Sequence, residues 1–349
     1  MKAILKSRPG DASVLLEGEV PIPVPGENDI VVKVAAVSIN PIDTKIRSLD
    51  YQVKAYGRGR ENDTSQVLGF DAAGTVESVG SKVTKFKKGD RVLHAGVLGY
   101  QGAYAQYAVM DARLVGHLPD NLSFNKAAAL PLVSLTAWEA LVERLGFELN
   151  PAAPPNATLL IINGAGGVGS LAIQIARKLL KIPNVIATAS RPETVKWCAA
   201  NGATDVINHR DELAPQLKER GLKVTHILIN YSTEQYIDAC VELIEPLGKI
   251  CTLLRTPEPF KQMIPLVTKC LNISGEFMFC KGINMVDMES QGEILTAVAK
   301  ARSEGILDTI VTKTYPQFGA VPLQEAHRLV ESGTAIGKVV IGGVDKPWV

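Results

Sequence analysis

A glycine-rich turn of six residues is the feature that most limits how this chain can fold. Gly164-Ala165-Gly166-Gly167-Val168-Gly169 has the spacing G-x-G-x-x-G, and it lies between an apolar run and a stretch of helical periodicity. In such a unit the first glycine makes the tight turn, the second lets the backbone approach a pyrophosphate, and the third lets helix and strand pack closely. The sequence therefore predicts a dinucleotide-binding turn. A purely structural strand-to-helix turn is the alternative.

Strands and helices alternate on both sides of this turn. Hydrophobic periodicity predicts strands over residues 159–163, 185–189, 206–208, 226–230, 249–254 and 273–279. Helices are predicted between them over residues 168–181, 193–201, 212–220 and 234–244. Alternation of this kind is typical of a parallel sheet with helices on both faces.

The rest of the chain has a different pattern. Short strands are predicted at residues 30–37, 74–80, 88–93, 310–315 and 338–341, with a helix at 323–332. Residues 125–144 carry apolar residues at helical spacing, interrupted by Pro131. We therefore expect an α/β protein of two domains, in which a doubly wound domain over residues 127–306 is inserted into a β-rich domain of residues 1–126 and 307–349.

Charge and composition exclude several classes of protein. Lys and Arg total 37 and Asp and Glu total 36, so the net charge is +1, which argues against a nucleic-acid partner. No apolar stretch reaches the 18 or so residues of a membrane span, and Lys6 interrupts the N-terminus too early for a secretory signal. We expect a cytoplasmic protein. The five cysteines have no C-x-x-C spacing, so free thiols are predicted.

The end of the second strand of the doubly wound domain indicates which dinucleotide binds. NAD sites place an Asp or Glu there, whereas this strand ends in Ser190-Arg191-Pro192. The Ser190 hydroxyl and the Arg191 guanidinium suit a 2′-phosphate, which predicts NADPH over NADH. Two alternatives stay open: Glu193 could bind the ribose diol, and Arg191 could be a solvated charge at a helix entrance. His209, after the third strand, either flanks the phosphate or is a surface histidine.

Eight segments together resemble a known family. They are residues 38–45 (SINPIDTK), 69–74 (GFDAAG), 88–92 (KGDRV), the glycine turn, 189–194 (ASRPET), 202–209 (GATDVINH), 276–279 (EFMF) and 330–340 (VESGTAIGKVV). With these segments the chain resembles the medium-chain dehydrogenase/reductase superfamily over nearly its whole length, and within it the zinc-free quinone-oxidoreductase branch. The resemblance implies a GroES-like β-rich catalytic domain, a Rossmann cofactor domain and a homodimer.

The resemblance also implies a reaction without a metal. Zinc-containing members carry a cysteine where Asn40 stands and Gly-His-Glu where this chain has Gly69-Phe70-Asp71, and residues 94–102 lack the cysteines of a structural zinc lobe. Without a Lewis acid, simple alcohol oxidation is disfavoured. A quinone or an α,β-unsaturated carbonyl is a better acceptor, because conjugation carries the charge to an oxygen that hydrogen-bond donors can stabilise.

Residue roles follow from the same resemblance. The Asn40 amide is expected to face the nicotinamide and the substrate oxygen, and Lys45 either donates to that oxygen or is solvated. Tyr51 or Tyr56 is expected to place an aromatic ring over the cleft. Further contacts to NADPH are expected from Thr136, Asn230, Ser232, Leu253, Leu254, Phe277, Phe279 and Lys338. For the two phenylalanines, packing in the core or at a subunit interface is the alternative.

Two other functions remain open at this level. The first is a trans-acting enoyl-thioester reductase, for which Lys54, Arg58 and Arg60 could bind the phosphopantetheine of a carrier protein, although a solvated loop is the favoured explanation of these three residues. The second is an NADPH-binding protein with a structural or RNA-binding role, which the near-zero net charge disfavours.

Overall fold

The computed structural model describes residues 1–48, 67–150, 153–254 and 263–344. The chain divides into two compact units, one of Met1–Leu135 with Phe279–Val349 and one of Thr136–Met278. Compared with the expected domains, residues 127–135 and 279–306 belong to the first unit. The reason for the second difference is packing, because helix α10 (Met288–Ser303) lies along β7 (Val115–His117) and the 3-10 turn Ala112–Leu114.

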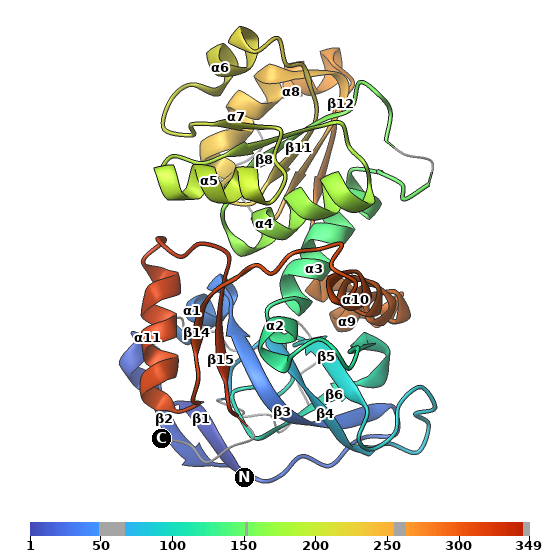
Figure 1. Ribbon diagram of the computed structural model, residues 1–349, viewed down its shortest axis with the longest axis vertical. Coiled ribbons are helices and arrows are strands. Elements are labelled where there is room, and N and C mark those ends of the chain that lie inside the picture. The colour runs from blue at the N-terminus through green and yellow to red at the C-terminus, as the bar shows by residue number, and fades with distance from the viewer. Residues whose placement is uncertain (49–66, 151–152, 255–262, 345–349) are drawn as a thin grey trace. The chain divides into compact units, whose positions relative to one another are not determined.

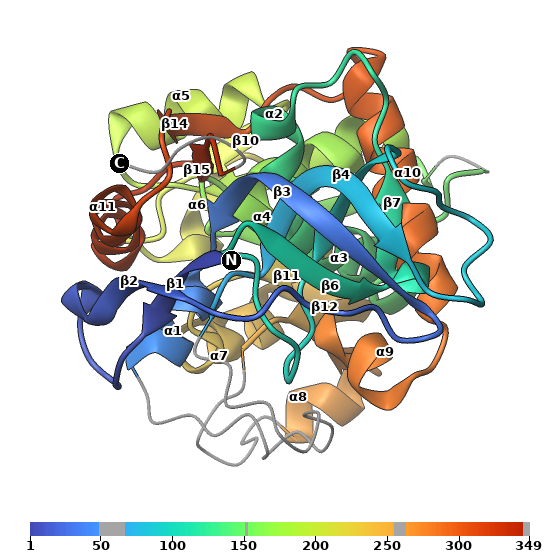
Figure 2. The same cartoon turned by 90° about the horizontal axis from the view of Figure 1, so that it is seen from below.

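The first unit is built on a seven-stranded sheet. Its strand order is β14-β15-β3-β4-β5-β7, and β6 pairs with β3 off this path (Figure 2). A separate antiparallel pair is formed by β1 and β2. The bounds are β1 (Lys2–Lys6), β2 (Leu15–Glu19), β3 (Asp29–Ile39), β4 (Asp71–Val79), β5 (Arg91–Ala95), β6 (Tyr107–Asp111), β14 (Val311–Tyr315) and β15 (Lys338–Gly342). Strand β3 is central, and all of its residues except Lys33 are buried, because sheet partners and helices cover it.

Helices close the first unit. They are α1 (Pro41–Ser48), α2 (Phe124–Ala128), α9 (Phe279–Asn284), α10 and α11 (Ala320–Glu331), with α11 against α1 and β2. The helix expected over residues 125–144 is divided: α2 ends at Ala128, α3 spans Pro131–Trp138, and a π-helix follows over Glu139–Arg144. Pro131 begins α3 because a proline fits the first turn of a helix and not its interior. No helix of the described ranges is both long and apolar enough to cross a bilayer.

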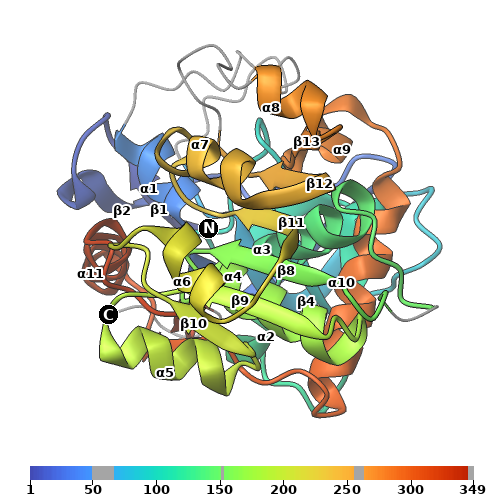
Figure 3. The same cartoon turned by 90° about the horizontal axis from the view of Figure 1, so that it is seen from above.

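The second unit is a six-stranded parallel sheet of order β10-β9-β8-β11-β12-β13. Helices α4 and α5 pack on one face and α6 and α7 on the other (Figures 1 and 3). The expected doubly wound sheet is therefore confirmed. The bounds are β8 (Thr158–Ile162), α4 (Gly167–Gln174), β9 (Asn184–Thr188), α5 (Pro192–Ala200), β10 (Asp205–Ile207), α6 (Leu213–Glu219), β11 (Val224–Ile229), α7 (Thr233–Leu243), β12 (Ile244–Thr252), α8 (Met263–Thr268) and β13 (Asn272–Gly275), with a π-helix over Ile175–Leu179 after α4.

The sixth strand is shorter than predicted. The sequence places a strand over residues 273–279, but β13 ends at Gly275, and Phe279 begins α9 in the first unit. The apolar residues after Gly275 leave the sheet because Phe279 packs edge-on against Phe70, with ring centroids 5.2 Å apart. Apolar composition alone does not distinguish a strand from such a buried turn.

Candidate functional site

The glycine turn lies where the strand order of the parallel sheet reverses. Ile162 of β8 pairs with Ile229 of β11, so the turn after β8 and Asn230 after β11 leave the sheet at neighbouring strand ends. Connections run in opposite directions along the sheet from this point, and ligands of open α/β sheets bind in the crevice it creates. The turn that the sequence predicts thus lies at the position where open α/β sheets bind their ligands.

Each glycine of the turn has its own environment. A Cβ on Gly169 would lie 2.4 Å from the Asn163 carbonyl oxygen, and a Cβ on Gly164 would lie 2.6 Å from the Ala187 side chain. These two glycines are needed for close packing of α4 on the sheet. A Cβ on Gly166 would approach only the Asn163 amide, at 3.1 Å. Gly166 caps α4, and Gly167 and Val168 open it, so this backbone is available to a phosphate at the positive end of the helix.

A cation, Arg191, follows the end of β9, and the strand itself contributes no carboxylate. Arg191 is the N-cap of α5, where the Thr194 hydroxyl bonds both its backbone N–H and its carbonyl. Its side chain is 30% exposed, and its Nε lies 3.2 Å from a carboxylate oxygen of Glu193. Ser190 is half-buried beside it. The guanidinium is thus held at the strand end, with Glu193 as its ion-pair partner.

His209 lies at the adjacent strand end. Its Nδ1 is 3.3 Å from the Thr188 hydroxyl at the end of β9. Burial, together with the positive charges of Arg210 and Arg191, lowers the pKa of His209. Arg191 and His209, 18 positions apart in the sequence, are therefore electrostatic neighbours, which sequence reasoning proposed only as an alternative to a surface histidine.

The carboxyl end of β11 holds an unusual amide. Both side-chain polar atoms of Asn230 are buried and have no hydrogen-bond partner within the described ranges. Unpaired buried amides are costly, so a ligand that supplies partners would stabilise this position. Ser232 adopts a left-handed conformation (φ 39°) at the start of α7. Leu253 and Leu254 follow β12, and both are half-buried.

Three further expected contacts have different environments. Thr136 is buried in α3, at 6% exposure. Phe277 is 42% exposed, whereas Phe279 is 4% exposed and packs against Phe70 in the first unit. For Phe279 the structure therefore shows the core packing that sequence analysis gave as the alternative.

In the first unit, Asn40 belongs to a buried polar cluster. Its side-chain nitrogen donates to Asp71 (2.7 Å), and its side-chain oxygen accepts from the Lys338 ammonium (2.5 Å). Lys338 also donates to Asp71 (2.9 Å) and to the Ile39 carbonyl (3.1 Å). Asp71 accepts further bonds from the Ser38 hydroxyl and the backbone N–H of Leu132. Lys338 is 3% exposed, so its ammonium is engaged inside this unit and is not presented to a cofactor.

A second buried chain of polar groups begins three residues after Asn40. Asp43 accepts from the backbone N–H groups of Asn40 (2.7 Å) and Phe70 (3.2 Å) and bonds the Tyr104 hydroxyl. Burial raises the pKa of Asp43 to about 7, and the charge of Asp71 adds to this shift. From the sequence, Asp43 is expected to support a neighbouring site residue or a local turn rather than to act as a base, and its bond to the Asn40 backbone agrees with such a supporting role.

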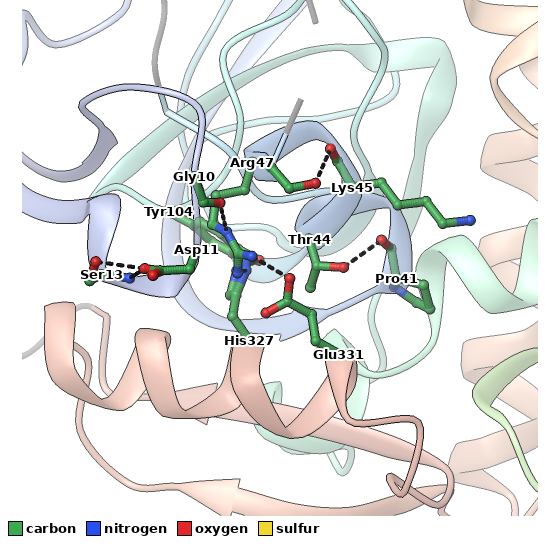
Figure 4. Close-up of polar contacts among 11 residues, drawn as sticks. Gly10, Asp11, Ser13, Pro41, Thr44, Lys45, Arg47, Tyr104, His327 and Glu331 are labelled. Atoms are coloured by element: carbon green, nitrogen blue, oxygen red, sulfur yellow. Dashed lines mark hydrogen bonds and ion pairs between the residues drawn. The ribbon is translucent and has the colours of Figure 1, made fainter. Parts of the chain in front are cut away.

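The series of hydrogen-bonded polar groups that begins at Asp43 continues to α11 (Figure 4). Tyr104 lies 3.2 Å from Nε2 of His327, whose Nδ1 is 3.2 Å from Arg47, and Arg47 pairs with Glu331. Because a guanidinium only donates, His327 accepts at Nδ1 and donates from Nε2 to Tyr104. Burial and the charge of Arg47 lower the pKa of His327 to about 3, so the ring is neutral. These hydrogen bonds and the ion pair connect α1 to α11.

Lys45 points elsewhere. It is exposed on α1, and Figure 4 shows its side chain extending away from the Arg47 group. Tyr51 and Tyr56, expected over the cleft, and Lys54, Arg58 and Arg60, considered for a carrier protein, lie outside the described residues.

Among the described residues, the donors of a zinc site do not come together. Within residues 1–48, 67–150, 153–254 and 263–344, no three His, Cys, Asp or Glu side chains are placed to share a metal ion. At Asn40 and Asp71 the oxygens surround the Lys338 ammonium, which repels a divalent cation. His94 is buried, and burial lowers its pKa to about 4. All five cysteines are free, and Cys198, Cys240 and Cys251 are buried.

Comparison with known proteins agrees with this architecture. The family described as "Alcohol dehydrogenase GroES-like domain" matches residues 26–120, and the one described as "Zinc-binding dehydrogenase" matches residues 201–341. A zinc-type alcohol dehydrogenase-like protein of Staphylococcus aureus is 39% identical over 320 residues, covering 91% of this chain and 92% of the relative. The chain belongs to the medium-chain dehydrogenase/reductase superfamily. It is an oxidoreductase of this nicotinamide-dinucleotide-binding family.

Other members of the superfamily carry a different name. The quinone oxidoreductase of Lama guanicoe is 30% identical over 348 residues, covering 98% of this chain and 97% of the relative. The Escherichia coli quinone oxidoreductase, solved in complex with NADPH, superposes with a TM-score of 0.79 at 27% identity, covering 98% and 100% of the two chains. Relatives named for alcohol dehydrogenases and for quinone oxidoreductases thus share this fold.

Proposed function

We propose that this protein is a zinc-independent, NADPH-dependent reductase of quinones or α,β-unsaturated carbonyl compounds. The observation that carries the proposal is the Lys338 ammonium inside the Asn40–Asp71 cluster. It occupies the oxygen donors with a fixed monovalent cation, so this part of the chain has no Lewis acid to stabilise an alkoxide. A conjugated acceptor needs only hydrogen-bond donors at the oxygen that gains charge.

The second unit supports the cofactor assignment. The Gly166–Val168 backbone suits the pyrophosphate. The Asn230 amide at the next strand end, for which the described residues supply no partner, suits the nicotinamide half. Arg191 and His209 suit the 2′-phosphate that distinguishes NADPH from NADH. The E. coli relative was solved with NADPH, which agrees with this choice.

The reaction balances as follows. Bound NADPH supplies a hydride, which together with one proton from water reduces the conjugated double bond and leaves NADP⁺. The protein's own residues orient the acceptor and stabilise the oxygen that becomes negative. In this proposal Asn40 donates to that oxygen.

The test is a screen with a metal assay. Purified protein is incubated with NADPH and a panel of quinones, enones, alkenals, acyl thioesters and simple alcohols with NADP⁺, and metal content is measured by elemental analysis. The proposal expects turnover on quinones or enones, no alcohol oxidation, and less than about 0.1 zinc per chain. Stoichiometric zinc in active protein would contradict it. A tight NADPH complex without turnover would favour the non-catalytic alternative.

A further inference from the structure

The Asn40 amide is held from both ends by opposite charges. Its oxygen accepts from the Lys338 ammonium at 2.5 Å, and its nitrogen donates to the Asp71 carboxylate at 2.7 Å. A flipped amide would put NH₂ against the ammonium and C=O against the carboxylate, which is repulsive at both ends. The direction of this amide is therefore set by the ion pair and not by shape, because the two ends of the group are nearly the same size.

Asp71 is itself held in place. Its two oxygens accept from Ser38, Asn40, Lys338 and the backbone N–H of Leu132. Lys338 uses its three hydrogens on Ile39, Asn40 and Asp71. All three hydrogens of the ammonium are thus engaged. The hydrogen bonds of the ion pair hold the neighbouring side chains and backbone groups in place.

One hydrogen of the Asn40 amide is left over. The side-chain nitrogen carries two hydrogens, and a single acceptor, Asp71, is found for them in the part of the chain that the structure describes. The residue is 1% exposed, so water does not readily satisfy the second hydrogen. A buried donor without an acceptor is costly, and sites that bind polar ligands keep such donors available.

Resting on the function proposed above, we infer that Lys338 and Asp71 are positioning residues that orient and polarise Asn40, so that its second N–H is presented to the oxygen of the acceptor substrate. The ammonium draws electron density toward the amide oxygen, which makes the N–H a stronger donor. The pair thus gives a neutral side chain part of the effect that a cation would have at this oxygen, without a metal ion.

The decisive variant neutralises the pair. Asp71→Asn together with Lys338→Met removes both charges, and replacement of a buried ion pair by neutral residues often leaves stability unchanged. The inference expects kcat on the best quinone or enone to fall about 100- to 1,000-fold, as for loss of one oxyanion donor, while KM for NADPH stays within about twofold. A folded double variant with kcat within about twofold of wild type would overturn it.

A double-mutant cycle that includes Asn40 distinguishes a positioning role of the ion pair from a general loss of structure. Asn40→Ala alone is expected to lower kcat by about the same factor, and adding the Asp71→Asn and Lys338→Met changes should lower it no further. Independent, multiplying losses would contradict the inference. Arg47→Met is the matched control, because Arg47 is another buried cation of this unit (1% exposed), paired with Glu331 and without contact to Asn40. It should lower the melting temperature and leave kcat within about twofold.

A readout that needs no turnover keeps the inference separate from the proposed function. In protein with ¹⁵N-labelled asparagine, the Asn40 side-chain hydrogen bonded to the Asp71 carboxylate should lie downfield of an ordinary amide hydrogen in NMR, because the bond is charge-assisted. In the neutral double variant this hydrogen should move upfield. If its chemical shift is unchanged, the inference is wrong even if the reductase activity is confirmed. If wild type is inactive on the whole panel, the proposed function and the catalytic part of the inference both fail, and NMR then tests only the orientation.

Discussion

The ammonium of Lys338 lies 2.5 Å from the side-chain oxygen of Asn40, although the two residues are 298 positions apart in the sequence. The contact joins β15 to the end of β3, two strands that pair antiparallel with Val339 opposite Ile39. Sheet register therefore brings the lysine to the asparagine. The same register lets the oxygens of Ile39, Asn40 and Asp71 accept hydrogen bonds from the Lys338 ammonium. This arrangement is the basis for proposing a reductase that uses no zinc.

Cofactor choice is tested at Arg191. Arg191→Ala is expected to raise KM for NADPH about 10- to 100-fold, because a charge-assisted contact to phosphate is worth about 1.5–3 kcal/mol. KM for NADH should stay within about twofold. Steady-state kinetics with both cofactors check this.

The control for Arg191 is Lys196→Ala, which removes an exposed cation from the same helix. It should affect neither cofactor. Equal losses with NADPH and NADH for Arg191→Ala would refute the phosphate role. A selective loss with NADH in Glu193→Gln would instead support the ribose alternative.

The pH dependence of NADPH binding should report His209. Burial and the charges of Arg210 and Arg191 lower its pKa in the free protein, so the ring is neutral at pH 7. A dianionic phosphate would raise that pKa, so binding takes up a proton, and NADPH affinity falls as pH rises through the window between the free and bound pKa values. Titration calorimetry in buffers of different ionisation enthalpy measures this uptake.

The His209→Gln variant isolates the histidine from the phosphate. It should lose the proton uptake that the histidine contributes and keep the contribution from the phosphate, whose own second pKa is about 6. NADH binding should show no such linkage in either protein. Unchanged proton uptake by His209→Gln would place the phosphate elsewhere.

The glycines of the turn should separate folding from binding. Gly169→Ala puts a Cβ 2.4 Å from the Asn163 carbonyl and should cost about 1–3 kcal/mol of unfolding free energy. Gly166→Ala, whose Cβ would approach the Asn163 amide at 3.1 Å, should cost less than about 1 kcal/mol and still weaken NADPH binding about tenfold or more. Urea unfolding and fluorescence titration with NADPH measure the two effects.

Gly275→Ala is the matched control for the turn, because its added Cβ would lie more than 4 Å from every described atom beyond its chain neighbours. It should change neither stability nor binding beyond about 0.5 kcal/mol. Normal NADPH affinity in Gly166→Ala would favour the purely structural interpretation of the turn.

A buried carboxyl group should make the second unit less stable at high pH. Burial raises the pKa of Glu276 to about 9, and the negative charge of Glu139 and a hydrogen bond to it add to this shift. Arg144, which donates to Glu276 at 3.1 Å, opposes the shift only in part. The folded state therefore binds a proton that the unfolded state loses above its ordinary value of 4.5, so stability falls as pH rises from about 5 to about 9. The slope from this group is at most about 1.4 kcal/mol per pH unit.

Glu276→Gln mimics the protonated form and should flatten this part of the pH profile. Urea unfolding at pH 5.5, 7.0 and 8.5 measures it, and the variant should gain most relative to wild type at pH 8.5. Glu304→Gln, an exposed carboxylate 3.8 Å from Lys300, is the control and should leave the profile unchanged. Parallel profiles for wild type and Glu276→Gln would show that Glu276 is ionised in the folded protein.

Much of the fold followed from local patterns. The strand before Gly164 and the helix after Gly169 form where periodicity and glycine spacing predict them, because both depend on residues close in the chain. The same logic failed after Gly275. There the apolar run 277–279 matches a strand in composition, but Phe279 packs against Phe70, more than 200 positions earlier. A local pattern cannot contain that information.

The sequence by itself determined the order of strands and helices, the glycine turn, and the absence of an acid at the end of β9, because each is a property of neighbouring residues. Only the tertiary structure decided what Asn40 contacts. Asp71 is 31 positions away from it and Lys338 is 298, and they meet because β3 pairs with both β4 and β15. A buried charge is stable only beside its partners, so the identity of those partners, and hence the direction of the Asn40 amide, is set by how the strands are arranged.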